Sequence, residues 1–91
     1  MTDDPMEAFR SRFRDCCARD LAALQVLVDA GTRSGEDLRR IAHDLSGLGG
    51  TFGFPAVSEA AGVVDDALLQ GLPATADELA HLTATLREVL R

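Results

Sequence analysis

The sequence contains no lysine, no tryptophan and no tyrosine, and phenylalanine is its only aromatic residue type. Without lysine the chain lacks the side chain that holds nucleotide phosphates in a P-loop, so ATP binding is not expected. No apolar run approaches the roughly 20 residues that a membrane-spanning helix needs. No basic N-terminal segment precedes an apolar stretch, as a secretory signal requires. These absences exclude membrane insertion and favour a cytoplasmic location.

The charge balance is acidic, because 15 Asp and Glu residues outnumber 9 arginines and give a formal net charge of −6. This charge argues against nonspecific binding to nucleic acid or to anionic membranes as the main role. The hydrophobic fraction of 46% and the charged fraction of 26% are ordinary for a soluble globular domain. A chain of 91 residues has room for one modest core. We therefore expect one domain over residues 1–91, and a monomer.

The two cysteines, Cys16 and Cys17, are neighbours in the sequence. Adjacent side chains on a helix point about 100° apart, so a disulfide between them is geometrically poor. No second pair and no CxxC motif accompanies them, so no metal or redox site is expected. We expect two reduced thiols, at least one of which faces the interior.

Strands are not expected, because β-branched and aromatic residues are sparse and no segment alternates apolar with polar residues. Four segments instead repeat apolar residues at spacings of three and four, which is typical of amphipathic helices. They extend from Asp4-Pro5 to near Gly31, from Ser34 to residues 51–53, from Pro55 to before Gly71, and from near Pro73 onward. The residues predicted to face the core are Met6, Phe9, Phe13, Cys17, Leu21, Leu24 and Val28; Leu38, Ile41, Leu45, Leu48 and Phe52; Val57, Ala60, Ala61, Val64 and Leu68; and Leu79, Leu82, Leu86 and Val89.

Each predicted helix has one apolar face, and the short connections between helices favour antiparallel neighbours. Four such faces are buried together most simply in a bundle. The sequence therefore predicts an all-α fold, an antiparallel up-down-up-down four-helix bundle. The few residues before Asp4 are expected to fray.

His43 is the residue that most strongly indicates a function. The apolar residues from Leu38 to Phe52 fall within an arc of about 80°, and His43 points about 180° away from its centre. Its imidazole is therefore expected to face water. Gly47 and Gly50 lie nearby, although glycine inside a helix costs about 0.8–1 kcal/mol relative to alanine. The glycines indicate space kept clear around the ring. His81 has no unusual neighbours, and we interpret it as a histidine without a functional role.

Polar residues flank His43 on both sides: Arg39 and Arg40 precede it by one turn, and Ser46 follows it by one turn. Arginine binds phosphate through paired N–H groups, and serine can donate a further hydrogen bond. Neutral imidazole is a competent nucleophile near pH 7. This set suits a dianionic group bound to the ring. The rival interpretation, a solvated face whose arginines pair with acidic residues (Glu36 and Asp44), is equally compatible with the helix pattern.

The run from His43 to Gly53, HDLSGLGGTFG, resembles the motif of histidine-containing phosphotransfer (HPt) domains. That motif is H-x-L-K-G followed by small residues and a further glycine. Downstream, HPt domains often carry a leucine-like residue, then alanine four positions on, then leucine and glutamate. The corresponding residues in this chain are Val57, Ala61, Val64 and Asp65. One position departs from the motif, because Ser46 stands where the family usually has lysine.

The resemblance implies that His43 is a phosphoacceptor and that the protein is a phosphohistidine carrier, not an enzyme. Its partners would be a sensor histidine kinase and response-regulator receiver domains, with phosphate passing between His43 and receiver aspartates. The residues expected to contact the phosphoryl group or the partner are Arg39, Arg40, Ser46, Gly47 and Gly50. No cofactor of its own is implied, and Mg²⁺ is expected in the partner receiver domain.

The main alternative is a helical interaction module that binds a kinase or receiver without carrying phosphate, which the presence of His43 disfavours. Another is the phosphoacceptor domain of a larger kinase, although the methionine at position 1 and the end at Arg91 favour a freestanding protein. A metal-binding bundle ranks last, because inward-facing Glu-x-x-His pairs are missing.

Overall fold

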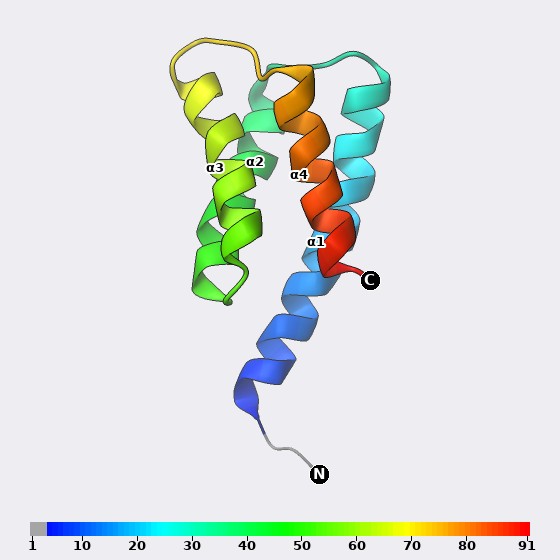
Figure 1. Cartoon of the computed structure of the whole chain (residues 1–91), viewed down its shortest axis with the longest axis vertical. Coiled ribbons are helices and arrows are strands. Elements are labelled where there is room, and N and C mark those ends of the chain that lie inside the picture. Colours follow the sequence, from blue (N-terminus) through cyan, green and yellow to red (C-terminus); the bar gives the residue numbers. More distant parts are fainter. Residues whose placement is uncertain (1–3) are drawn as a thin grey trace.

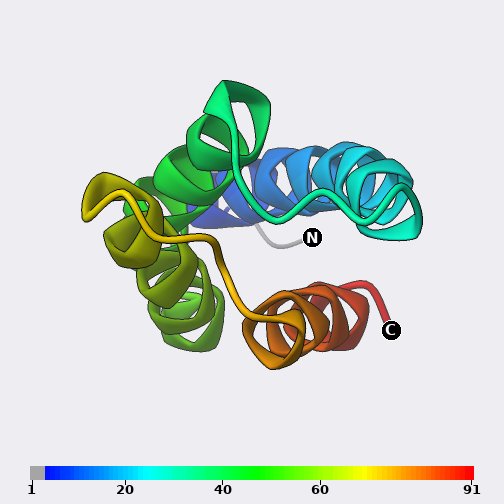
Figure 2. The ribbon, with the colours of Figure 1, turned by 90° about the horizontal axis from the view of Figure 1, so that it is seen from above.

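The computed structural model describes residues 4–91, which form four α-helices and, over that range, no strand. The helices are α1 (Pro5–Asp29), α2 (Glu36–Thr51), α3 (Pro55–Leu69) and α4 (Ala76–Val89). They run alternately up and down (Figure 1). Each helix packs against its neighbours in chain order, and α4 returns to α1 (Figure 2). The predicted all-α antiparallel bundle is confirmed, whereas the expected fraying before Asp4 concerns residues outside the described range.

Two of the predicted helix starts are confirmed at proline. Asp4 caps α1 by accepting a hydrogen bond from the Met6 backbone N–H at 2.9 Å, and Pro5 occupies the first helical position. Pro55 occupies the first helical position of α3, which has no side-chain cap. Proline suits this position because its missing N–H would have no partner inside the helix and its φ is already helical.

Of the other two helices, α2 starts later than predicted and α4 starts near Pro73, as predicted. α2 begins at Glu36 rather than Ser34, because Gly35 adopts a φ of +106° that breaks the helix between them. α4 begins at Ala76, three residues after Pro73. There Thr75 and Glu78 form a capping box, in which each side chain accepts a hydrogen bond from the other's backbone N–H.

The core contains most of the residues predicted to face inward. The fully buried large side chains are Phe13, Cys17, Leu24, Leu38, Leu45, Val57, Val64, Leu82 and Leu86. Cys17 is therefore the inward-facing thiol, and burial raises its pKa to about 12. Cys16 is half-buried, and both cysteines are free thiols. The prediction that at least one of the two thiols faces inward is confirmed.

Three residues predicted to face the core are instead substantially exposed. Met6 and Phe9 lie near the start of α1, which extends past the other three helices (Figure 1). The other three helices do not extend along this end of α1 (Figure 1). Leu48 is 39% exposed because the buried face of α2 is turned toward Ala42 and Gly49, both buried, rather than toward Leu48.

The pairing of α2 with α3 is close at Gly49. A Cβ atom at this position would lie 2.9 Å from the backbone nitrogen of Ser58 and 3.2 Å from the backbone oxygen of Phe54. Glycine is therefore required for the two backbones to approach this closely. The Ser58 hydroxyl also donates a hydrogen bond to the Ser46 carbonyl at 2.7 Å. These contacts fix α3 against the helix that carries His43.

The four phenylalanines of the chain gather beside the α2–α3 turn. Phe13 of α1 stacks on Phe54 with ring centroids 4.9 Å apart and packs on Phe52 at 5.8 Å. Phe9 stacks on Phe52 at 6.0 Å. Such aromatic pairs are worth about 0.5–1.5 kcal/mol beyond the area they bury. They anchor the turn to α1 and hold this end of the α2–α3 pair in place.

Candidate functional site

His43 lies in the middle of α2, and 63% of its side chain is exposed. The preceding residue, Ala42, and Leu45, two positions further on, are fully buried. The backbone is thus fixed by the core while the imidazole faces solvent, as the helical pattern predicted. A ring in this position is both held and accessible to another protein.

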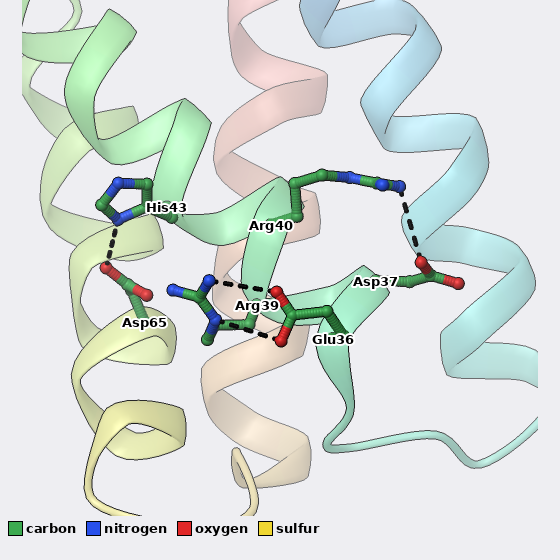
Figure 3. A network of polar contacts seen from close by, with 6 residues as sticks. All are labelled: Glu36, Asp37, Arg39, Arg40, His43 and Asp65. Carbon is green, nitrogen blue, oxygen red and sulfur yellow. Dashed lines mark hydrogen bonds and ion pairs between the residues drawn. The ribbon is translucent and has the colours of Figure 1, made fainter.

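The imidazole has one close partner, which comes from the neighbouring helix. Nδ1 of His43 lies 3.1 Å from Oδ2 of Asp65 on α3 (Figure 3). An ionised carboxylate can only accept a hydrogen bond, so Nδ1 carries the proton and donates it. In the neutral ring the other nitrogen, Nε2, then has a free lone pair. Figure 3 shows the Nε2 edge of the ring pointing away from Asp65.

Asp65 is largely buried, with 11% of its side chain exposed. Its second oxygen, Oδ1, is buried and has no hydrogen-bond partner among residues 4–91. An unsatisfied buried acceptor typically costs about 1–3 kcal/mol. His43 is the only side-chain donor to Asp65 among residues 4–91, so without it both carboxylate oxygens would lack a side-chain partner. The pair holds the ring in one tautomer and in one orientation.

Asp65 is a site residue that the sequence reasoning missed. It was matched only to the acidic position of the HPt pattern and given no role. A usable signal was present, because Asp65 follows Ala61 by four positions and precedes Leu68 by three. It therefore lies on the face of α3 predicted to be buried, where an isolated carboxylate requires a partner.

The two arginines before His43 are both paired with acidic residues of the first turn of α2 (Figure 3). Arg39 donates to Glu36 at 3.0 and 3.4 Å, and Arg40 lies 3.5 Å from Asp37. The hydrogen bond and charge of Arg39 lower the pKa of Glu36, and Glu36 in turn raises that of Arg39. Of the pairs in the rival interpretation, the one with Glu36 is present, whereas the partner of Arg40 is Asp37 rather than Asp44.

On the other side of His43, toward the end of α2, two glycines leave the helix surface without side chains. A Cβ atom at Gly47 would meet no atom within 4 Å in the described chain, and one at Gly50 would meet only the Ser58 hydroxyl, at 3.5 Å. Ser46 is half-buried, and its hydroxyl oxygen lies 3.4 Å from where a Cβ of Gly62 would stand. Gly47 and Gly50 thus leave open surface beside the ring.

In the part of the chain that the structure describes, no helix is long and apolar enough to span a bilayer. The model of the Hpt domain family matches residues 8–91, which is nearly the whole chain. No curated protein and no solved structure was found to match the sequence. Hpt domains are phosphotransfer carriers rather than classical enzymes, and they interact with kinases and receiver domains of two-component systems. The chain therefore belongs to the Hpt domain family and has a phosphotransfer role in two-component signalling.

Proposed function

We propose that His43 is the phosphoacceptor of a phosphorelay, and that it exchanges a phosphoryl group with receiver aspartates or takes one from a histidine kinase. The observation that carries this proposal is the exposed imidazole whose Nδ1 is bound to the buried carboxylate of Asp65. That arrangement supports Nε2 as the attacking nitrogen, because its lone pair is free and it points away from Asp65.

In the transfer step, the lone pair of Nε2 attacks the phosphorus of an aspartyl phosphate. The new N–P bond forms as the P–O bond to the aspartate breaks, and the aspartate leaves as a carboxylate. The Nδ1 proton stays on the ring and continues to be donated to Asp65, whose negative charge stabilises positive charge developing on the imidazole. The reverse step regenerates free His43. No proton has to leave the ring in either direction.

The surface beside the ring suits the approach of another protein. Gly47 and Gly50 would let the loops around a receiver aspartate come close, because neither glycine has a side chain above the helix. We also propose that Ser46, Arg39 and Arg40 contact the phosphoryl group or the partner. For Arg40 this requires opening its ion pair with Asp37 at the protein surface, and such pairs are generally weak.

His43 has no lysine beside it, because the sequence contains none. Ser46 stands where HPt domains usually have lysine, and Arg39 and Arg40 belong to the turn that precedes the histidine. Phosphoryl transfer depends mainly on positioning and on stabilisation of negative charge. We therefore propose that a receiver partner supplies most of the cationic stabilisation, through its own basic side chain and its Mg²⁺.

The direct test is to mix the purified protein with a phosphorylated receiver domain and to follow the label. We expect phosphate to appear on this chain as an acid-labile, alkali-stable adduct, with loss of label from the receiver. Stable binding of the receiver with no label transferred would instead support the alternative of an interaction module that carries no phosphate.

Replacement of Asp65 should slow transfer without preventing binding of the partner. In Asp65→Asn the amide oxygen can still accept from Nδ1, but the negative charge that stabilises the imidazole is lost. We expect the transfer rate to fall about 10- to 100-fold, by comparison with the loss of the hydrogen-bond partner of a metal-bound histidine. Rapid-quench measurement of label transfer gives this rate. An unchanged rate would show that Asp65 does not assist His43.

A bulky acidic residue beside the ring should block transfer while preserving the fold. Gly47→Glu places a long, negatively charged side chain where a Cβ now meets open space. It would obstruct the partner and repel the dianionic phosphoryl group. We expect an unchanged helical circular dichroism spectrum and little transferred label in the same assay. Gly47→Ala is the matched control, and normal transfer in the Glu variant would exclude docking over this part of α2.

A further inference from the structure

Glu36 and Asp65 are two carboxylates on either side of one guanidinium group, that of Arg39. Arg39 is bound to Glu36 through Nε and one terminal nitrogen, at 3.4 and 3.0 Å. In Figure 3 the guanidinium lies between Glu36 and Asp65, on the Nδ1 side of the His43 ring. The negative charge of Asp65 also contributes to the raised pKa of Arg39. Arg39 is therefore bonded to Glu36 and close enough to Asp65 to feel its charge.

The two carboxylates differ in how much they would gain from the arginine. Glu36 is exposed, with 77% of its side chain accessible, so water can solvate it without Arg39. Asp65 is buried, and its Oδ1 has no donor among the described residues. A guanidinium group has five N–H donors, and only two of its nitrogens bond to Glu36. Of the two carboxylates, Asp65 would therefore gain more from a hydrogen bond with Arg39, through its Oδ1.

The surroundings of Arg39 allow it to turn. Arg39 and Glu36 line a surface cavity of about 420 Å³, whose other side includes Leu68, one turn after Asp65 on α3. The Arg39 side chain is 35% exposed, compared with 65% for Arg40. Arg39 is the more buried of the two, and it lies on the side of α2 that faces α3. One side of the Arg39 side chain borders this cavity, so neighbouring side chains do not enclose its guanidinium group.

We propose that Glu36 is a positioning residue for phosphotransfer, which holds Arg39 away from Asp65 and so reserves the Asp65 carboxylate for His43. This inference rests on the proposed role of His43. If Arg39 were free, it would bind Oδ1 and neutralise the charge of Asp65. The hydrogen bond from Nδ1 would weaken, and the ring would spend part of its time as the tautomer with the proton on Nε2. That tautomer has no lone pair at the accessible nitrogen.

The test compares two charge-matched variants of the first turn of α2. Glu36→Gln releases Arg39, whereas Asp37→Asn releases Arg40 and serves as the control, because Asp37 is equally exposed (75%). The ratio of the two His43 tautomers is measured from ¹⁵N chemical shifts of the ring nitrogens. The rate of phosphorylation is measured with phosphoramidate, a small phosphodonor that does not depend on docking of a partner protein.

We expect Glu36→Gln to increase the Nε2–H tautomer and to slow phosphorylation about tenfold, the lower end of the effect of losing an outer hydrogen-bond partner. Asp37→Asn should leave the tautomer ratio unchanged. In the double variant Glu36→Gln/Arg39→Gln, the tautomer ratio should return to that of the unaltered protein. Equal tautomer ratios in the two single variants, or no recovery in the double variant, would overturn the role of Glu36. Absence of phosphate on His43 in the unaltered protein would instead overturn the proposed function, and the tautomer ratios would still report on Glu36.

Discussion

Replacement of His43 by glutamine is expected to abolish phosphorylation of the protein while leaving its fold intact. No other side chain in the described chain combines exposure, a nucleophilic nitrogen and a fixed orientation by a buried carboxylate. The fold should be unaffected because the imidazole is 63% exposed and contributes no apolar surface to the core. Glutamine can also still donate an N–H toward Asp65. Because glutamine keeps a donor for Asp65, we expect a loss of stability below the about 1–3 kcal/mol that an unpaired buried acceptor costs.

The measurement is label transfer from a phosphorylated receiver, alongside thermal unfolding of the same preparations. His81→Gln is the matched control, since His81 is also exposed on a helix and the same residue is introduced. It should accept phosphate normally. Phosphate retained by His43→Gln would identify a different acceptor, and loss of phosphate in both variants would point to a defect unrelated to His43.

Replacement of Gly49 by valine is expected to have the largest effect on stability. The new side chain would meet the backbone of Ser58 and Phe54 at 2.9 and 3.2 Å, and backbone atoms cannot move aside as a flexible side chain can. Overpacking of this kind costs typically 1–3 kcal/mol, and the gain in helix propensity over glycine is smaller. We expect a loss of about 2 kcal/mol, which lowers the Tm of a domain of this size by about 8–16 °C.

Gly47→Val provides the control in the same helix. Its Cβ would stand in open space, so only the change in helix propensity acts, and the stability should stay the same or rise slightly. Chemical denaturation of both variants measures the difference. Similar stabilities for the two variants would contradict the close approach of α2 and α3 at Gly49.

The fold could be predicted because the signals for it are local. The Asp4-Pro5 and Pro55 starts depend on capping and on the fixed φ of proline, and both lie where the sequence placed them. The predicted start of α2 at Ser34 was two residues too early. Ser34 is a good capping residue in isolation, but the positive φ of Gly35 depends on how the loop returns to the bundle.

The candidate site was only partly predictable, because half of it depends on packing between helices. The outward direction of His43 follows from the periodicity of a single helix. Its hydrogen bond to Asp65 joins residues 22 positions apart, and its existence depends on the rotation of α3 against α2. The same is true of Gly49, since a close approach to Ser58 cannot be inferred from α2 alone. The exposure of Leu48 has the same origin.

The most direct test of whether Asp65 sets the chemistry of His43 is to determine which of its two ring nitrogens becomes bonded to phosphorus. The measurement is NMR of the phosphorylated, ¹⁵N-labelled protein, in which coupling to phosphorus identifies the bonded ring nitrogen and proton shifts locate the remaining N–H. We predict phosphorus on Nε2 of His43 and a proton retained on Nδ1, hydrogen-bonded to Asp65. Phosphorus on Nδ1, or on any residue other than His43, would contradict this arrangement.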